Sequence, residues 1–270
     1  MTSLAPIAFI DSGIGGLPYL ANFRAALPGA PLLYVADNRN FPYGQKSESE
    51  VRQAALDMTG RLVAQRDPAL IIVACNTASM LALDALRSNF AYEFVGVVPA
   101  VKPAAKASRS RVVGVMATER ALQGAYFDKL VAEFGGDCIV VRFAATELIN
   151  AIETDPFMTD KSYYIQLMEE IRHYFLSRQV DTIVLGCTHF LHLNQEMLSV
   201  FGKDFTILDS RQGVTRQSLR LLQDRNVLYQ YQAATASPQP GVFHLTASVV
   251  ADSMYPRVAA AYDLTFGGEL

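Results

Sequence analysis

The sequence contains few cysteines, no block of basic residues and no long apolar run. Three cysteines in 270 residues are too few, and odd in number, for a disulfide framework, and a reducing compartment would keep them as thiols. The formal net charge is −3 and the Lys and Arg residues are scattered, which argues against binding to nucleic acid or to an anionic membrane. We therefore expect a small molecule as the partner, with no nucleic acid and no membrane.

Signals for export or membrane insertion are also lacking. No apolar run approaches the roughly 20 residues that a helix needs to cross a bilayer. The first residues, MTSLAPIAFID, carry no basic region ahead of a long apolar stretch, unlike a secretory signal peptide. The sequence therefore predicts a soluble, cytoplasmic protein whose thiols are available for chemistry.

Short β-branched runs alternate with amphipathic segments along the chain. This alternation is typical of an α/β fold with a doubly wound parallel sheet. Because 270 residues exceed the usual size of a single core, we expect two lobes. The predicted strands are residues 7–11, 32–37, 69–75, 94–98, 111–117, 138–143, 182–187, 205–209 and 242–246.

The segments between these strands carry helix signals. Ser47 and Glu50 predict a capping box ahead of an apolar stripe at helical spacing. A second stripe, Leu122, Tyr126, Leu130 and Phe134, predicts a helix that stops at Gly135 and Gly136. The Asp155-Pro156 step is expected to separate two further helices. The segment ATASPQPG, residues 234–241, predicts a surface connection before a last strand and helix.

One sequence pattern occurs twice in the chain. In LIIVACNTAS (70–79) and in TIVLGCTHF (182–190), an apolar strand runs into a cysteine that is followed by small polar residues. Strand 7–11 likewise leads into Ser12, and strand 111–117 leads into Thr118. In open α/β sheets, ligands bind beyond the carboxyl ends of the strands, near helix N-termini. If two similar lobes face each other, a small ligand between them has one thiol on either side, which suits moving a proton between the faces of a carbon.

Five motifs make the sequence recognisable. In this order and spacing, DSGIGGL (11–17), FPYG (41–44), ACNTAS (74–79), GVVPA (96–100) and LGCTHF (185–190) resemble the cofactor-independent aspartate/glutamate racemase family. The resemblance covers the whole chain. It implies two similar α/β lobes, the first from residues 1–98 and 207–270 and the second from 99–206, with the active site in the cleft between them.

The resemblance also implies an activity, an isomerase that interconverts L- and D-glutamate and supplies D-glutamate for peptidoglycan, and so for cell wall biogenesis and cell shape. Neither a metal nor pyridoxal phosphate is expected, because two thiols account for inversion without a cofactor. The oligomeric state stays open, and a homodimer is compatible with the sequence.

Inversion at Cα needs a base on one face and an acid on the other. A thiol has a pKa of about 8.5, which a helix N-terminus or a polar neighbour lowers enough to give a usable thiolate. By resemblance, Asp11 assists Cys75, which acts on the D-isomer, and His189 assists Cys187, which acts on the L-isomer. Glu153 matches a further acidic position of the family beside the second thiol.

Holding a dianionic amino acid requires hydrogen-bond donors at both carboxylates. Residues after the cysteines and in the loops are expected to supply them, partly by type and partly by resemblance. Asp37 fits a further acidic family position with a less defined role, and Pro42 shapes its loop. The expected substrate-binding residues are Ser12, Asp37, Pro42, Tyr43, Gly44, Asn76, Thr77, Thr118 and Thr188.

Two positions depart from the family pattern. Ala121 stands where a second threonine is usual, and this loss of a hydroxyl keeps aspartate racemase, or a related amino-acid racemase, as an alternative. Leu191 replaces a usual proline. Purely structural roles are the alternative for two residues, since Asp37 could cap a turn and Glu153 could be a charged side chain on the solvent-exposed face of a helix. Cys138, inside a predicted strand, is expected to be a buried small hydrophobe.

Three other functions fit parts of the sequence. Gly13-x-Gly15 with Asp37 on the next strand imitates a dinucleotide fingerprint, but Pro18 occupies the third glycine position and Asp11 would repel a pyrophosphate. A non-catalytic amino-acid-binding protein is the alternative from another class, and the presence of both thiols and both helpers argues against it.

A zinc site is the third alternative. Cys187, His189 and His192 would have to be its ligands, and their spacing matches no common zinc motif.

Overall fold

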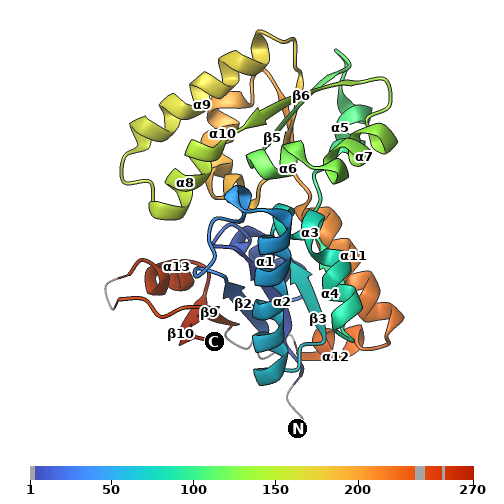
Figure 1. Cartoon of the computed structure of the whole chain (residues 1–270), viewed down its shortest axis with the longest axis vertical. Coiled ribbons are helices and arrows are strands. Elements are labelled where there is room, and N and C mark those ends of the chain that lie inside the picture. The colour runs from blue at the N-terminus through green and yellow to red at the C-terminus, as the bar shows by residue number, and fades with distance from the viewer. Residues whose placement is uncertain (1–3, 235–240, 251–252) are drawn as a thin grey trace. The chain divides into compact units, whose positions relative to one another are not determined.

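The computed structural model describes residues 4–234, 241–250 and 253–270. It divides into two compact units, Met1–Val97 with Arg211–Leu270, and Val98–Ser210. Each unit contains a parallel sheet flanked by helices (Figure 1). The doubly wound α/β class expected from the sequence is therefore confirmed. The connection expected at 234–241 falls largely on residues 235–240, which lie outside the described residues.

In the described part of the first unit, six strands pair in parallel in the order β10-β9-β2-β1-β3-β4. The strands are β1 (Ile7–Asp11), β2 (Leu32–Ala36), β3 (Leu70–Val73), β4 (Phe94–Gly96), β9 (Gly241–Leu245) and β10 (Leu264–Glu269). The helices are α1 (Leu17–Ala26), the 3₁₀ helix η1 (Tyr43–Gln45), α2 (Glu48–Gln65), α3 (Asn76–Leu81), α4 (Leu83–Asn89), α11 (Arg211–Asp224), α12 (Leu228–Ala233) and α13 (Tyr255–Ala261). The central position of β1 decides which loops meet at the carboxyl edge of the sheet.

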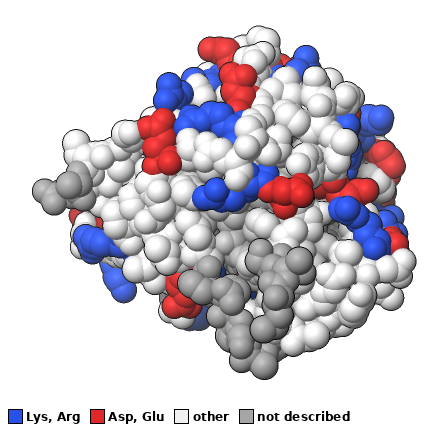
Figure 2. All heavy atoms as spheres, turned by 90° about the horizontal axis from the view of Figure 1, so that it is seen from below, with Lys and Arg blue, Asp and Glu red and all other residues white. Residues whose placement is uncertain are grey.

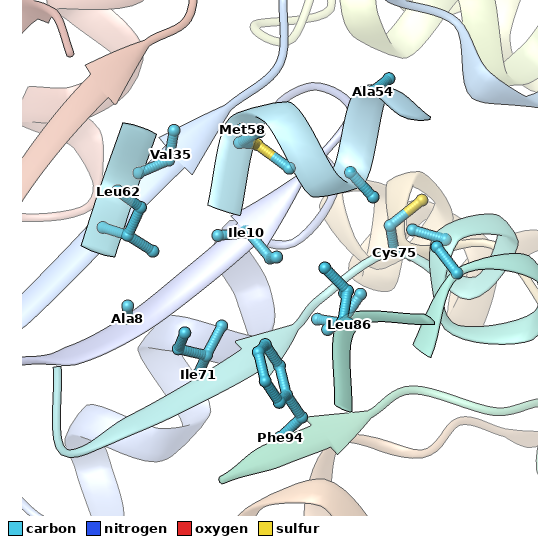
Figure 3. Packing of buried hydrophobic residues seen from close by; sticks show 14 of the residues in the cluster. Ala8, Ile10, Val35, Ala54, Met58, Leu62, Ile71, Cys75, Leu86 and Phe94 are labelled. Carbon is cyan, nitrogen blue, oxygen red and sulfur yellow. The ribbon is translucent and has the colours of Figure 1, made fainter. Parts of the chain in front are cut away.

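The core of the first unit is made by alternate residues of the sheet and by α2. Ile10, Val35 and Ile71 face Met58 and other apolar residues of that helix in one continuous cluster (Figure 3). The predicted capping box begins α2, because the Ser47 hydroxyl accepts from the Glu50 N–H while the Glu50 carboxylate accepts from the Ser47 N–H. The cluster reaches Cys75, so one candidate thiol lies at the end of the core.

Strand β10 was not predicted. Its sequence, LTFGGE, contains two consecutive glycines, and glycine is depleted in strands because it has no side chain to pack. In the fold, Gly267 is needed for a close approach, since an added Cβ would collide with the His244 ring of the neighbouring strand. The register shifts at this point, between Phe266 and Gly268. Pairing with β9, and not local propensity, therefore makes this segment a strand.

In the described part of the second unit, four strands pair in parallel in the order β6-β5-β7-β8. The strands are β5 (Val112–Ala117), β6 (Ile139–Ala144), β7 (Thr182–Leu185) and β8 (Thr206–Leu208). The helices are α5 (Val101–Ala107), α6 (Glu119–Gln123), α7 (Ala125–Phe134), α8 (Thr146–Thr154), α9 (Lys161–Leu176), the 3₁₀ helix η2 (Thr188–Leu193) and α10 (Asn194–Phe201). As in the first unit, the earliest strand lies next to the strand that leads to a cysteine.

Two local predictions in the second unit were wrong. The stripe from Leu122 to Phe134 belongs to two helices, α6 and α7, because Gly124 between them is extended and caps α7. Tyr126 is 39% exposed and does not join the core. Cys138 is half-buried rather than buried, because it precedes β6, an edge strand with one unpaired side. The expected break at Asp155 is confirmed, since α8 ends just before it.

Positive and negative side chains are intermixed on the face drawn in Figure 2, among residues of other kinds. This surface offers no broad basic area of the kind that follows a nucleic-acid backbone. Within the described ranges, none of the helices combines the length and apolar character needed to cross a membrane.

A glycine in β5 allows a helix to pack directly on the second sheet. An added Cβ at Gly114 would lie 2.7 Å from the Phe175 ring of α9, which is fully buried. We expect Gly114→Ala to lower the free energy of unfolding by about 1–3 kcal/mol through overpacking, as measured by urea unfolding. Gly213→Ala is the control, since it adds a Cβ to helix α11 with nothing within 4 Å and should stabilise by about 0.4–1 kcal/mol. A Gly114→Ala protein as stable as the wild type would contradict the packing argument.

Candidate active site

Each unit brings a cysteine to the carboxyl edge of its sheet by the same backbone pairing. In the first unit, Ala74 donates its N–H to the Ile10 carbonyl at 2.8 Å, just before Cys75. In the second, Gly186 donates to the Met116 carbonyl at 2.7 Å, just before Cys187. Both cysteines therefore lie where pairing between neighbouring parallel strands ends, and the repetition noted in the sequence is a repetition of structure within each unit.

The first cysteine cluster consists of Asp11, Ser12 and Cys75. The Ser12 N–H and hydroxyl both donate to Asp11 Oδ1, at 2.5 and 3.2 Å. The Ser12 Oγ lies 3.8 Å from Cys75 Sγ. Asp11 and Ser12 are buried, and Cys75 is 6% exposed. The thiol thus has a hydroxyl beside it whose position is fixed by a buried carboxylate.

A tyrosine that the sequence analysis missed holds the loop of the first cluster. The Tyr34 hydroxyl, from β2, donates to the Gly13 carbonyl at 2.8 Å and to Asp11 Oδ2 at 3.5 Å, and accepts from the Gly16 N–H at 3.0 Å. Gly16 itself lies so close to the next strand that an added Cβ would be 2.6 Å from the Ala74 Cβ. A hydroxyl in the middle of a buried apolar strand was the available signal, because it must find partners when buried.

The second cysteine cluster consists of Glu153, Cys187 and His189. His189 Nδ1 lies 3.6 Å from Cys187 Sγ, and its Nε2 lies 2.8 Å from Glu153 Oε2. Helix α8 supplies the glutamate and η2 supplies the histidine, and all three side chains are buried. Sequence reasoning grouped these residues correctly, but only the fold gives the order thiol, imidazole, carboxylate.

The charge of His189 follows from its two partners. Burial opposes the charged ring, but the hydrogen bonds to Cys187 and Glu153 outweigh burial and raise the pKa of His189 well above its usual value. A protonated ring donates from both nitrogens, so it can face a thiolate and a carboxylate at once. The second cluster is therefore built to hold a proton next to its thiol.

Asp37 lies in a third cluster in the first unit. Its carboxylate accepts from Tyr43 Oη at 2.6 Å, from Asn40 Nδ2 at 2.9 Å and from Thr246 Oγ1 at 2.5 Å. Burial, followed by the charge of Asp37, raises the pKa of Tyr43 well above 10, so the phenol stays a donor. Thr246 was missed, because it is distant in sequence and matches no motif.

Asn76 stands out among the other predicted residues. It follows Cys75 at the start of α3, it is buried, and neither its amide oxygen nor its amide nitrogen has a hydrogen-bond partner among the described residues. Thr118 instead caps α6, its hydroxyl accepting from the Ala121 N–H at 3.2 Å.

The predicted site residues fall into both units. Those in the first are Asp11, Ser12, Asp37, Pro42, Tyr43, Gly44, Cys75, Asn76 and Thr77, and those in the second are Thr118, Glu153, Cys187, Thr188 and His189. Pro42, which follows a cis peptide bond, precedes η1, the short helix that contains Tyr43 and Gly44. Thr77 and Thr188 are buried beside their cysteines. Within the described residues, no three His, Cys, Asp or Glu side chains are grouped as metal ligands.

Curated relatives align over most of the chain. A glutamate racemase of Sphingopyxis alaskensis is 37% identical over 246 residues, covering 90% of this chain and 89% of the relative. A glutamate racemase of Herpetosiphon aurantiacus is 38% identical over 226 residues, covering 83% and 87%. The similarity therefore includes both units.

Solved structures and a family model agree with these relatives. Escherichia coli glutamate racemase, in complex with L-glutamate and the activator UDP-MurNAc-Ala, superimposes with a TM-score of 0.84 at 27% identity over 99% of this chain and 98% of that one. Thermus thermophilus glutamate racemase, in complex with β-chloro-D-alanine, gives 0.73 at 27% over 98% and 96%. The model of the Asp/Glu/Hydantoin racemases matches residues 19–215, which include both buried cysteines. The chain belongs to the Asp/Glu/Hydantoin racemase family.

Proposed function

We propose that the chain is a glutamate racemase that interconverts L- and D-glutamate through Cys75 and Cys187. The observation that carries the proposal is the paired placement of two buried thiols, each at the end of a central parallel strand and each beside a polar partner. The relatives named glutamate racemase support the choice of substrate, since they align over most of both chains. The D-glutamate formed would serve peptidoglycan synthesis.

Racemisation requires the two thiols to act on opposite faces of one substrate Cα. With D-glutamate bound, the Cys75 thiolate removes the Cα proton, and the electron pair is delocalised into the α-carboxylate. The Cys187 thiol then gives its proton to the opposite face, which forms L-glutamate and leaves Cys187 as the thiolate. The reverse reaction exchanges the roles, so each turnover uses one thiol as base and the other as acid.

The two cysteine clusters prepare their thiols differently. On the D-isomer side, Asp11 fixes Ser12, whose hydroxyl lies beside Cys75. On the L-isomer side, the protonated ring of His189 lies between Glu153 and Cys187. A neighbouring cation of this kind favours a thiolate. The chemistry of the reaction is symmetric, but the electrostatics of the two clusters is not.

Substrate binding is assigned to polar groups around the thiols. The unpartnered amide of Asn76 is the strongest candidate, because a buried polar group without a partner is costly and a ligand would satisfy it. Thr77, Thr188, Ser12 and Thr118 are assigned to substrate binding by their positions beyond the ends of the strands. The loop of Pro42, Tyr43 and Gly44 contributes by its backbone.

The proposal includes a location and an assembly. The proposed location is the cytoplasm, because a reducing compartment keeps cysteines as free thiols. A homodimer is the assembly to test first, by light scattering on the pure protein.

The first test is the reaction itself. Pure protein without added metal or cofactor should interconvert D- and L-glutamate, and should turn over aspartate much more slowly, as measured by circular dichroism of the amino acid. Aspartate turnover equal to or greater than that of glutamate would show that Ala121 has changed the substrate. Stoichiometric binding of glutamate without any turnover would favour the non-catalytic alternative.

Each thiol is required in both directions. Cys75→Ser and Cys187→Ser should each lower kcat by about 10² to 10⁴ for both isomers, because loss of a positioned proton-transfer group has that effect. Cys138→Ser is the matched control, since Cys138 is half-buried, belongs to neither cysteine cluster and directs its thiol to the Ala105 carbonyl at 3.7 Å. Near wild-type turnover by a folded Cys75→Ser or Cys187→Ser protein would end the two-thiol mechanism.

The protonation of His189 depends on Glu153. A histidine pKa raised by folding stabilises the protein fully below the unfolded value of about 6.5, and this contribution is lost as pH rises through the folded pKa. Glu153→Gln should lower the pKa of His189, measured by NMR titration of its ring, and should weaken this pH dependence of unfolding. Glu147→Gln, on the same helix but exposed and bonded to Tyr163, should change neither. An unaltered His189 titration in Glu153→Gln would contradict the assigned pairing.

A further inference from the structure

We propose that Thr246 is a positioning residue for the substrate-binding loop. Through the carboxylate of Asp37 it holds Tyr43, and with it the backbone of residues 42–44, in the conformation that binds glutamate. Asp37 then acts as an internal anchor and does not contact the substrate. This inference rests on the proposed function, because it gives a cause for the geometry of a loop that the proposal assigns to substrate binding.

The carboxylate of Asp37 is already occupied by the protein. It is 1% exposed, and three side chains donate to it, with Thr246 on Oδ1, Tyr43 on Oδ2 and Asn40 reaching both oxygens. Its own N–H donates to the Asp11 carbonyl at 2.8 Å, which fixes its backbone at the end of β2. With both oxygens accepting from these donors, the carboxylate has little capacity left for a substrate ammonium group.

Tyr43 connects this anchor to the candidate site. Its ring is 1% exposed and belongs to the same core cluster as Cys75. Its hydroxyl ends on Asp37 at 2.6 Å, so the ring is fixed at its apolar face and at its polar tip. Because Tyr43 begins η1, the ring position also sets the backbone of Gly44. A change at Asp37 is therefore transmitted to the loop that precedes α2.

Thr246 comes from a distant part of the chain. It follows β9, whose Leu245 is paired with Ala36 at the end of β2, so the sheet itself places Thr246 next to Asp37. Its N–H donates to the Ala36 carbonyl at 3.1 Å, and its carbonyl accepts from Arg61 at 2.7 Å and from Arg39 at 3.2 Å. The backbone of Thr246 is thus held independently of its hydroxyl.

This independence permits a sharp substitution. Thr246→Val keeps the shape of the side chain and the bonds of its backbone, and removes the hydroxyl that donates to Asp37 and accepts from the Arg39 N–H at 3.3 Å. Thr246→Ser restores the hydroxyl and removes a methyl group. Thr59→Val is the matched control, because Thr59 is fully buried on α2 and its hydroxyl has no hydrogen-bond partner among the described residues.

The kinetic experiment compares KM with kcat for D- and L-glutamate in the full-length protein. Thr246→Val should raise KM about tenfold, the effect of losing roughly one charge-assisted hydrogen bond from the anchor, while kcat changes by less than about threefold. Thr246→Ser should return KM to near the wild-type value, and Thr59→Val should leave both constants unchanged. A Thr246→Val protein with wild-type KM, or a Thr246→Ser protein as impaired as Thr246→Val, would overturn the proposal.

A second measurement needs no activity. Hydrogen exchange of residues 43–46, without substrate, should be faster in Thr246→Val than in the wild type, Thr246→Ser and Thr59→Val, because the loop loses one of its fixed points. This segment leaves out Arg39, whose N–H bonds directly to the Thr246 hydroxyl. Unchanged exchange would refute the anchor, and faster exchange with an unchanged KM would refute its role in binding. If the wild type shows no racemisation, the proposed function fails while the exchange experiment still decides whether Thr246 holds the loop.

Discussion

Parallel hydrogen bonding between two neighbouring strands in each unit is the constraint on which both cysteine clusters depend. Ile10 accepts from Ala74 in the first unit, and Met116 accepts from Gly186 in the second. Each bond is the last of its ladder, so the next residue, the cysteine, lies at the carboxyl edge of the sheet. Strand pairing alone therefore places each thiol at the edge of the sheet where α/β proteins bind ligands.

The two thiols share a packing arrangement but differ in their polar partners. Gly16 lets the first loop lie against Ala74. Gly186 likewise lies so close to the neighbouring strand that an added Cβ would be 2.9 Å from the Met116 carbonyl oxygen. A glycine therefore solves the packing problem in both units, and the clusters differ only in the polar partners of their thiols. A hydroxyl fixed by a carboxylate accompanies Cys75, whereas an imidazole held by Glu153 accompanies the other thiol. Two clusters of one architecture thus provide unlike proton donors and acceptors for a reaction whose products are mirror images.

Buried polar groups show which residues are committed to the fold and which are available to a ligand. Asp37 and Glu153 are buried carboxylates that accept from the protein's own side chains, and such pairing offsets the cost of removing a charge from water. Asn76 is equally buried, yet its amide has no hydrogen-bond partner among the described residues. That contrast is why the asparagine is assigned to substrate binding and Asp37 to positioning.

Local patterns in the sequence determined the fold class, nearly all the strands, the start of α2 and the two cysteines at strand ends, because strand runs, caps and turns depend on neighbours a few residues apart. They did not predict the break at Gly124, the strand β10, the Tyr34 hydroxyl beside Asp11 or the role of Thr246. These depend on which strands lie side by side. The order β10-β9-β2-β1 brings Thr246 to Asp37 and Tyr34 to the loop after β1, and no local pattern encodes the hydrogen bonds that form between residues far apart in the chain.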